Sequence, residues 1–214
     1  MKYNSYIDHT LLKATATTSQ IISLCNEAKE YEFYAVCVNS AFVKLASKEV
    51  ESSNVKVAAV VGFPLGAMST KAKVLETEQC IKDGAQEIDM VIHIGMLKNG
   101  NYQYVENEIA DIKKACGNNI LKVIIETCYL TDEEKRMACR LALIAGADFV
   151  KTSTGFGTGG ATLEDVSLMR DEVGDTMKIK ASGGIKDLET AKKYIDLGVS
   201  RIGTSSGITI VNSN

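Results

Sequence analysis

The sequence predicts an α/β fold, namely a single (β/α)8 TIM barrel in which residues 1–214 form one domain. Short runs rich in β-branched residues alternate with longer amphipathic runs along the whole chain, which is the pattern of βα units around a parallel sheet. Eight such units in 214 residues give about 27 residues per unit, a compact value within the range of these barrels. No linker or low-complexity tract interrupts the alternation, so the sequence favours one domain.

The β-like runs have the length of strands. At least one helical run lies between each pair of consecutive β-like runs. They cover residues 6–9, 34–38, 56–61, 87–92, 121–126, 148–151, 177–181 and 201–203. The alternative architecture is a doubly wound open sheet, which usually has fewer units. Its dinucleotide-binding fingerprint, G-x-G-x-x-G, does not follow the first predicted strand. The barrel is therefore the preferred prediction.

Capping residues mark the predicted helices. Three threonines precede apolar residues at helical intervals and stand three positions before a glutamine, glutamate or aspartate, as N-caps do. The pairs are Thr17 with Gln20, Thr131 with Glu134 and Thr162 with Asp165. A glycine also follows three of the helical runs, where a left-handed C-terminal cap is common. These glycines are Gly84, Gly146 and Gly198.

Composition and charge argue against several classes of function. Apolar residues make up 45% and charged residues 24% of the chain, which is typical of an ordered globular protein. The net charge of −3, without clusters of lysine and arginine, argues against binding to nucleic acid. The amino terminus lacks the apolar core of a signal peptide, and no stretch resembles a membrane span.

The cysteines and histidines do not predict a metal site. The cysteines are scattered without a C-x-x-C pair, at positions 25, 37, 80, 116, 128 and 139, so neither a zinc site nor a disulfide framework is indicated. His9 and His93 are too few for a typical zinc site, and we interpret His9 as structural. We therefore expect no metal and a cytoplasmic protein with reduced thiols.

A lysine interrupts an apolar strand at two places in the second half of the chain. Lys151 follows Phe149-Val150, and Lys180 repeats this pattern about one structural unit later. A buried ammonium is costly unless it is paired or deprotonated, so such a lysine either reaches water at an edge or is a functional amine. Two nearby cations lower each other's pKa, and a neutral lysine is a nucleophile towards carbonyl carbons.

An acid is expected beside these lysines. Period-2 alternation puts Glu87, Asp89 and Val91 on one face of the fourth predicted strand. Asp89 is therefore a candidate for the barrel interior, where it would balance the lysines and act as general acid or base through a water. A purely structural counter-ion is the alternative, and Asp89 alone does not decide between the two roles.

Glycines and hydroxyl residues follow the last three predicted strands. In barrels, backbone N–H groups of these loops and of a short helix start commonly hold a phosphate. Each glycine alone would be a turn former, but together they predict an anion site. The residues are Gly155, Gly183, Gly184, Gly203, Ser205 and Ser206.

These residues stand in motifs that resemble those of deoxyribose-phosphate aldolases, which are class I (Schiff-base) aldolases with a barrel fold. The resemblance covers nearly the whole chain, and the motifs occur in family order. The two lysine motifs are the most specific. The matching segments are residues 6–12, 36–38, 62–66, 87–92, 149–156, 180–185 and 201–207.

The resemblance implies cleavage of 2-deoxyribose 5-phosphate to glyceraldehyde 3-phosphate and acetaldehyde, without a metal or cofactor. Lys151 would form the Schiff base, Lys180 would lower its pKa and Asp89 would relay protons. The implied substrate-binding residues are Asp8, Cys37 and Thr152, with Gly155, Gly183, Gly184, Gly203, Ser205 and Ser206 around the phosphate. A homo-oligomer, either a dimer or a tetramer, is also implied.

The sequence departs from the family pattern at three places. His93 stands where members usually have asparagine, and Lys13-Ala14-Thr15 replaces a more usual lysine-proline pair. The chain ends soon after Val211, without the tail tyrosine that some relatives use in proton transfer. From this last difference we expect a changed rate rather than a changed reaction.

Two other interpretations stay open at this point. One is a different barrel enzyme that acts on a phosphorylated substrate, such as an isomerase or another Schiff-base aldolase, because a phosphate site does not fix the reaction. The other is a non-catalytic phosphosugar-binding protein that keeps the barrel. The presence of both lysines together with the acid favours an enzyme.

Overall fold

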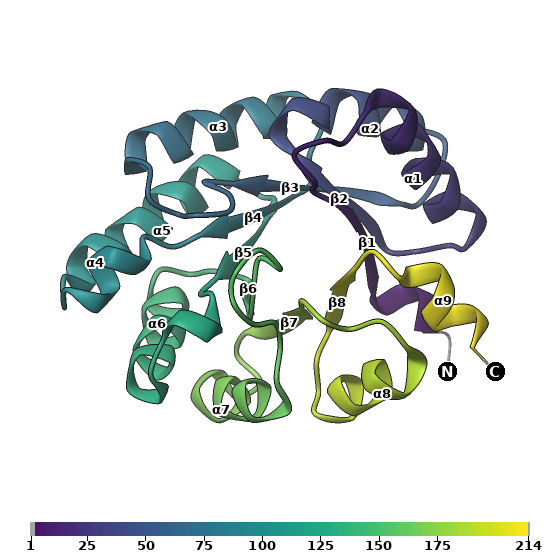
Figure 1. Cartoon of the computed structure of the whole chain (residues 1–214). Helices are drawn as coiled ribbons and strands as arrows, with labels where there is room; N and C mark the ends of the chain where they lie inside the picture. Colours follow the sequence, from purple (N-terminus) through teal and green to yellow (C-terminus); the bar gives the residue numbers. More distant parts are fainter. Residues whose placement is uncertain (1–2, 214) are drawn as a thin grey trace.

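Eight parallel strands close into a barrel in the computed structural model of the chain, which describes residues 3–213 (Figure 1). The strands follow sequence order, and β1 closes the barrel against β8 by pairing Ile7 with Ile202. The strands are β1 (Ile7–Leu11), β2 (Ala35–Asn39), β3 (Lys56–Val61), β4 (Glu87–Val91), β5 (Ile120–Ile124), β6 (Phe149–Lys151), β7 (Lys178–Ser182) and β8 (Arg201–Thr204). The predicted (β/α)8 barrel is confirmed. Of the predicted domain, residues 1, 2 and 214 lie outside the described residues.

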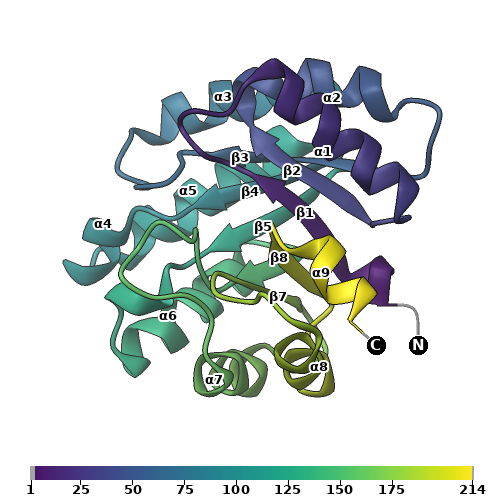
Figure 2. The ribbon, with the colours of Figure 1, turned by 45° about the vertical axis from the view of Figure 1, so that its right-hand side comes forward.

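Helices surround the strands in both ribbon views (Figures 1 and 2). They are α1 (Thr18–Glu30), α2 (Val43–Val50), α3 (Thr70–Lys82), α4 (Ile94–Lys98), α5 (Tyr102–Cys116), α6 (Asp132–Ile144), α7 (Leu163–Val173), α8 (Leu188–Asp196) and α9 (Gly207–Asn212). Short 3-10 turns add η1 (Tyr3–Tyr6), η2 (Ser40–Phe42) and η3 (Thr127–Tyr129). Helix α9 packs beside η1, so the last helix lies close to the start of the described chain (Figure 2).

Only β3 has the predicted bounds at both ends; the other strands differ from the predicted ranges by one or two residues, and for β1 and β5 the reason is local. Strand β1 begins at Ile7 because the residues before it form the η1 turn, and it extends to Leu11, which pairs with Val38. Strand β5 ends at Ile124, two residues before its predicted end. There Glu126 has a φ of 52°, a left-handed conformation that no strand residue adopts.

The predicted caps form, with one variation. The pairs that begin at Thr17 and Thr131 are complete capping boxes. In the third pair the Thr162 hydroxyl accepts a hydrogen bond from the Asp165 amide, while the Asp165 carboxylate pairs with Lys135 at 2.7 Å. The predicted glycine caps all have positive φ, at 105° (Gly84), 77° (Gly146) and 85° (Gly198).

On six of the eight strands, alternation separates an apolar face from a face that carries a buried charge. On β4, Ile88 and Met90 lie in the apolar layer between the sheet and the helices. Glu87 and Asp89 point the other way, into the barrel, and are also buried, with 1% and 0% of their surface exposed. The core that stabilises the fold therefore lies outside the barrel wall, and charged side chains fill part of its interior.

A further buried ion pair lies outside the barrel. Lys73 Nζ of α3 is 2.8 Å from Glu108 Oε1 of α5, and both side chains are fully buried. Lys73 also donates to the Val91 carbonyl at 2.8 Å, and the His93 amide donates to Glu108 at 3.0 Å. The pair thus ties two helices to the segment that leaves β4.

We expect Glu108→Ala to destabilise the fold by roughly 3–5 kcal/mol, because it leaves a buried ammonium without its partner. Burial already lowers the pKa of Lys73 even with Glu108 beside it. The double variant Lys73→Met/Glu108→Leu should lose less free energy of unfolding, since no buried charge remains. Urea unfolding measures both free energies, with the exposed Asp111→Ala on the same helix as control. A loss below about 1 kcal/mol for Glu108→Ala would contradict the expectation.

Candidate active site

Seven charged side chains from six strands gather inside the barrel, and all of them are buried. They are Asp8 (β1), Glu87 and Asp89 (β4), Lys122 (β5), Lys151 (β6), Lys180 (β7) and Arg201 (β8). Each takes its position from strand alternation, which turns the neighbouring apolar residues outward. Sequence positions as distant as 8 and 180 are therefore in direct contact, with Asp8 Oδ2 at 2.5 Å from Lys180 Nζ.

Asp89 is the centre of this cluster. Its Oδ1 accepts from Lys122 at 2.8 Å, and its Oδ2 accepts from Lys151 at 2.7 Å and from Lys180 at 2.8 Å. Burial alone would raise the pKa of Asp89, but the charges of the three lysines outweigh it and hold the pKa well below 3.8. Asp89 is therefore a carboxylate that accepts from three ammonium groups.

Lys180 is held as a cation. Burial by itself lowers the pKa of Lys180, but the charges of Asp8 and Asp89 outweigh it and raise the pKa above its ordinary value. The pKa of Asp8 is shifted in the opposite direction. Burial acts to raise its pKa, yet Lys180, Lys122 and Arg201 together bring it down to about 2. The two groups form a stable ion pair beneath the strand ends.

Lys151 differs from its two lysine neighbours. Burial is the largest influence and lowers its pKa, Asp89 acts to raise it, and the charge of Lys180 lowers it again, so that the pKa lies below 10.5. For Lys122, in contrast, Asp89 and other acids outweigh burial and raise the pKa. The sequence predicted that Lys180 lowers the pKa of Lys151. Lys180 does act in this direction, and burial lowers the pKa of Lys151 more strongly than Lys180 does.

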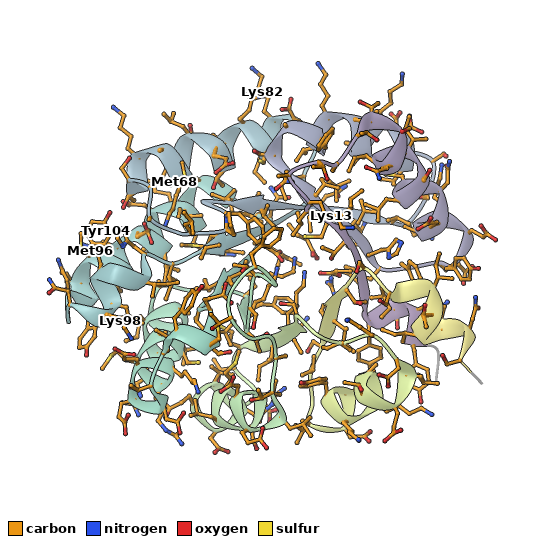
Figure 3. All side chains as sticks on the ribbon, in the orientation of Figure 1. Lys13, Met68, Lys82, Met96, Lys98 and Tyr104 are labelled. Atoms are coloured by element: carbon orange, nitrogen blue, oxygen red, sulfur yellow. The ribbon has the colours of Figure 1, made fainter. Side chains whose placement is uncertain are left out.

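A cavity of about 280 Å³ opens above Lys151 at the carboxyl ends of the strands. Of the residues predicted from the sequence, the loop residues Gly155, Gly183, Gly184, Gly203, Ser205 and Ser206 all line it. Within the described range 3–213, its lining includes Lys13, Lys151 and Lys186 and no acidic residue. Figure 3 shows Lys13 near the middle of the view and Lys82 and Lys98 at its edge. The cavity is therefore suited to an anionic ligand.

The other predicted site residues lie below or beside this cavity. Asp8, Asp89 and Lys180 are fully buried beneath it, and none of them contributes to its lining. Cys37 is also fully buried, in a small apolar cluster with Leu12, and burial raises the pKa of its thiol. A direct contact of Asp8 or Cys37 with substrate thus stays a prediction.

Thr152 has a structural contact of its own. Its hydroxyl donates to the Ser182 carbonyl at 3.1 Å and accepts from the Ser182 amide at 3.0 Å, which joins β6 to β7. Thr152 is fully buried and does not line the cavity. Its role in substrate binding stays a prediction, and its hydrogen bonds to Ser182 fix the end of β6 against β7.

Three charged residues of the cluster were not singled out from the sequence as site residues. Lys122 Nζ lies 2.5 Å from Glu87 Oε2, and Arg201 Nη2 lies 2.9 Å from Glu87 Oε1. The Arg201 guanidinium also stacks on Tyr34, 3.2 Å from the ring centre. A signal for Lys122 existed, because it interrupts an apolar strand in the same way as Lys151.

The two histidines have structural contacts, as predicted for His9. His9 Nε2 lies 2.7 Å from Glu27 of α1, and the His93 ring caps α4 by accepting from the Met96 amide. Among residues 3–213, no group of three or more His, Cys, Asp or Glu side chains is arranged to hold a metal ion. In the same range, no helix combines the length and apolar character that crossing a membrane requires.

Comparison with known proteins agrees with this geometry. The model of the DeoC/LacD family of aldolases matches residues 3–212. A deoxyribose-phosphate aldolase from Coprothermobacter proteolyticus is 57% identical over 99% of this chain and 96% of its own length.

Solved structures show the same relationship. A putative deoxyribose-phosphate aldolase from Coccidioides immitis superposes with a TM-score of 0.96 at 43% identity, over 99% of this chain and 85% of the other. A deoxyribose phosphate aldolase from Aeropyrum pernix, described as a unique tetrameric structure, gives 0.92 at 32% identity, over 98% of this chain and 89% of the other. The chain therefore belongs to the DeoC/LacD family of aldolases, enzymes that are carbon–carbon lyases.

Proposed function

We propose that residues 1–214 form one catalytic domain that reversibly cleaves 2-deoxy-D-ribose 5-phosphate to D-glyceraldehyde 3-phosphate and acetaldehyde through a Schiff base on Lys151. The observation that carries this proposal is the position of Lys151. It is the one member of the buried charge cluster that also lines the cavity, and its pKa is lowered. Its amine thus borders the cavity and loses its proton more readily than an ordinary lysine amine.

The first steps form an electron sink on Lys151. The neutral amine adds to the C1 aldehyde of the open-chain sugar, and the resulting carbinolamine loses its hydroxyl as water after taking up a proton. A protonated imine, the iminium ion, remains. Its positive charge takes the place of the ammonium beside Asp89, which lies 2.7 Å from the amine. The carboxylate therefore stabilises the intermediate as it stabilised the protonated lysine.

Bond cleavage follows from the iminium. Asp89 accepts the proton of the C3 hydroxyl through a water molecule, the electrons of the C2–C3 bond move into the iminium to give an enamine, and glyceraldehyde 3-phosphate leaves. Lys180 stays charged beside Asp89 and balances the carboxylate. The enamine is then protonated at C2, and hydrolysis releases acetaldehyde and the free amine. The iminium supplies the electrophilic pull, so the reaction requires no metal.

The phosphate is proposed to bind in the cavity above Lys151. The loops after β6, β7 and β8 offer backbone N–H groups, and Ser205 and Ser206 add hydroxyls. Lys13 and Lys186 line the same cavity, and their positive charges favour a dianion. This binding is remote from the bond that breaks, so it anchors the sugar while Lys151 reacts.

The assembly and the cellular compartment are part of the proposal. The relative from Aeropyrum pernix is described as tetrameric, which supports a homo-oligomer, a dimer or a tetramer, for this chain. The cysteines at positions 25, 37, 80, 116, 128 and 139 are all free thiols, which supports a reducing cytoplasm.

Lys151→Arg is expected to remove at least about a thousandfold of kcat, because a guanidinium does not form the imine. Borohydride added with substrate should label Lys151 in the native enzyme and leave the variant unlabelled, as read by peptide mass analysis. Lys82→Arg, a substitution of an exposed lysine on α3, serves as control and should behave as the native enzyme. Near-normal turnover by Lys151→Arg would refute the assignment.

Lys180→Leu is expected to shift the pH profile to the alkaline side. The charge of Lys180 lowers the pKa of Lys151, so its removal raises that pKa. Because only the neutral amine reacts, kcat/KM rises through the pKa of Lys151, and the midpoint of this rise should move to higher pH. An unmoved midpoint in a folded variant would leave Lys180 with a role in packing or substrate contact only.

Treatment with a metal chelator is expected to leave the cleavage rate unchanged, because the iminium performs the polarising role that a metal would have in a different barrel enzyme. The measurement is initial rate with 2-deoxyribose 5-phosphate after dialysis against EDTA. Loss of activity that returns on adding a divalent metal would favour a metal-dependent mechanism instead. Binding of the sugar phosphate without turnover or lysine labelling would favour a non-catalytic binding protein.

A further inference from the structure

Glu126 has an unusual backbone and a buried carboxylate. It stands two residues after the end of β5, at the carboxyl edge of the barrel, with a φ of 52° and a ψ of 69°. Such a left-handed conformation is uncommon for a residue with a side chain, and its cost is frequently accepted at functional sites. Only 1% of Glu126 is exposed.

The carboxylate holds the loop after β6. The Thr154 amide donates to both carboxylate oxygens, at 3.2 and 3.3 Å, and the Thr154 hydroxyl donates to Oε2. The same hydroxyl accepts from the Phe156 amide at 3.0 Å. Because a backbone amide only donates, the Thr154 hydroxyl accepts from Phe156 and is left to donate its own hydrogen to Glu126.

The loop packs directly on this carboxyl group. A Cβ atom added at Gly157 would lie 3.2 Å from the Glu126 carboxyl carbon and 2.7 Å from Cys128 Sγ, so a larger residue there would displace one of these side chains. The Cys128 thiol also donates to Glu126 Oε1 at 3.9 Å. Glu126 therefore packs against residues 154–157 and fixes the conformation of this loop.

Within residues 3–213, Glu126 has no ion pair with a lysine, arginine or histidine. Its carboxyl oxygens are bonded instead to the amide and hydroxyl of Thr154 and to the Cys128 thiol. The loop that it holds is part of the cavity wall, since Thr154, Gly155 and Phe156 all line the cavity.

We propose that Glu126 is a positioning residue that shapes the loop 154–157 around the phosphate end of the substrate. It thereby determines the preference for phosphorylated over unphosphorylated deoxysugars. This inference rests on the proposed function. Glu126 does not line the cavity itself and acts through Thr154.

The test is Glu126→Gln, which keeps the size of the side chain but places an NH2 group opposite one of the two Thr154 donors. With 2-deoxyribose 5-phosphate, KM should rise about tenfold or more while kcat changes by less than about threefold. With unphosphorylated 2-deoxyribose, kcat/KM should stay within about twofold of the native enzyme, because no phosphate contact is lost. If Glu126 had a merely structural role, the substitution would lower kcat/KM for both sugars by the same factor.

A double-mutant cycle tests the path through Thr154. Thr154→Val removes the hydroxyl, and the rise in KM of Glu126→Gln/Thr154→Val should equal that of the more affected single variant rather than the product of the two. Glu133→Gln, at an exposed position of α6, is the matched control and should be kinetically native. If Glu126→Gln does not fold, Thr154→Val alone is the test. Its KM for 2-deoxyribose 5-phosphate should rise, while its kcat/KM for unphosphorylated 2-deoxyribose should stay near the native value.

The outcomes separate this inference from the proposed function. Equal losses with both sugars, or an unchanged KM for the phosphorylated one, would overturn the role of Glu126 while the native enzyme still cleaves its substrate. Absence of cleavage and of a borohydride-trapped Lys151 in the native enzyme would instead overturn the proposed function.

Discussion

The contact of one carboxylate with three ammonium groups organises the interior of the barrel. Asp89 accepts from Lys122, Lys151 and Lys180, and further acids surround only two of these lysines. The cluster contains three acidic and four basic side chains, so it holds one positive charge in excess. Arginine does not lose its proton, and the pKa values of Lys122 and Lys180 are raised. Lys151 is therefore the cation whose deprotonation relieves the excess.

The barrel architecture makes this arrangement possible. Strand alternation keeps the apolar core outside the wall, so charged groups inside the barrel do not interrupt the layer that stabilises the fold. Lys151 stands at the carboxyl end of β6, where the charge cluster ends and the cavity begins. The same residue thus contacts both the charge cluster and the cavity. Glu126, two residues after the end of the neighbouring β5, holds the loop that follows Lys151 through its contact with Thr154.

Sequence reasoning was successful where a signal is local. The alternation of β-like and helical runs predicted the eight strands, and both lysines in apolar runs lie buried on strands, while their catalytic roles stay predictions. The contacts of Arg201 with Asp8 and Glu87 were not predictable, because they depend on closure of β8 against β1 and on register across the barrel. The relative size of each influence on the pKa of Lys151 was likewise not predictable, because it depends on burial and on distances between charged atoms. The left-handed Glu126 has no sequence signal, since its conformation is imposed by its contacts with the next loop.

The central claim concerns the proton on Lys151, so the most direct measurement is an NMR titration of the lysine side chains in the free enzyme, with Lys151→Arg used to assign the resonance. Lys151 should titrate with a midpoint below 10.5, while Lys122 and Lys180 stay protonated to higher pH. A Lys151 midpoint at or above that of an ordinary exposed lysine would contradict the claim.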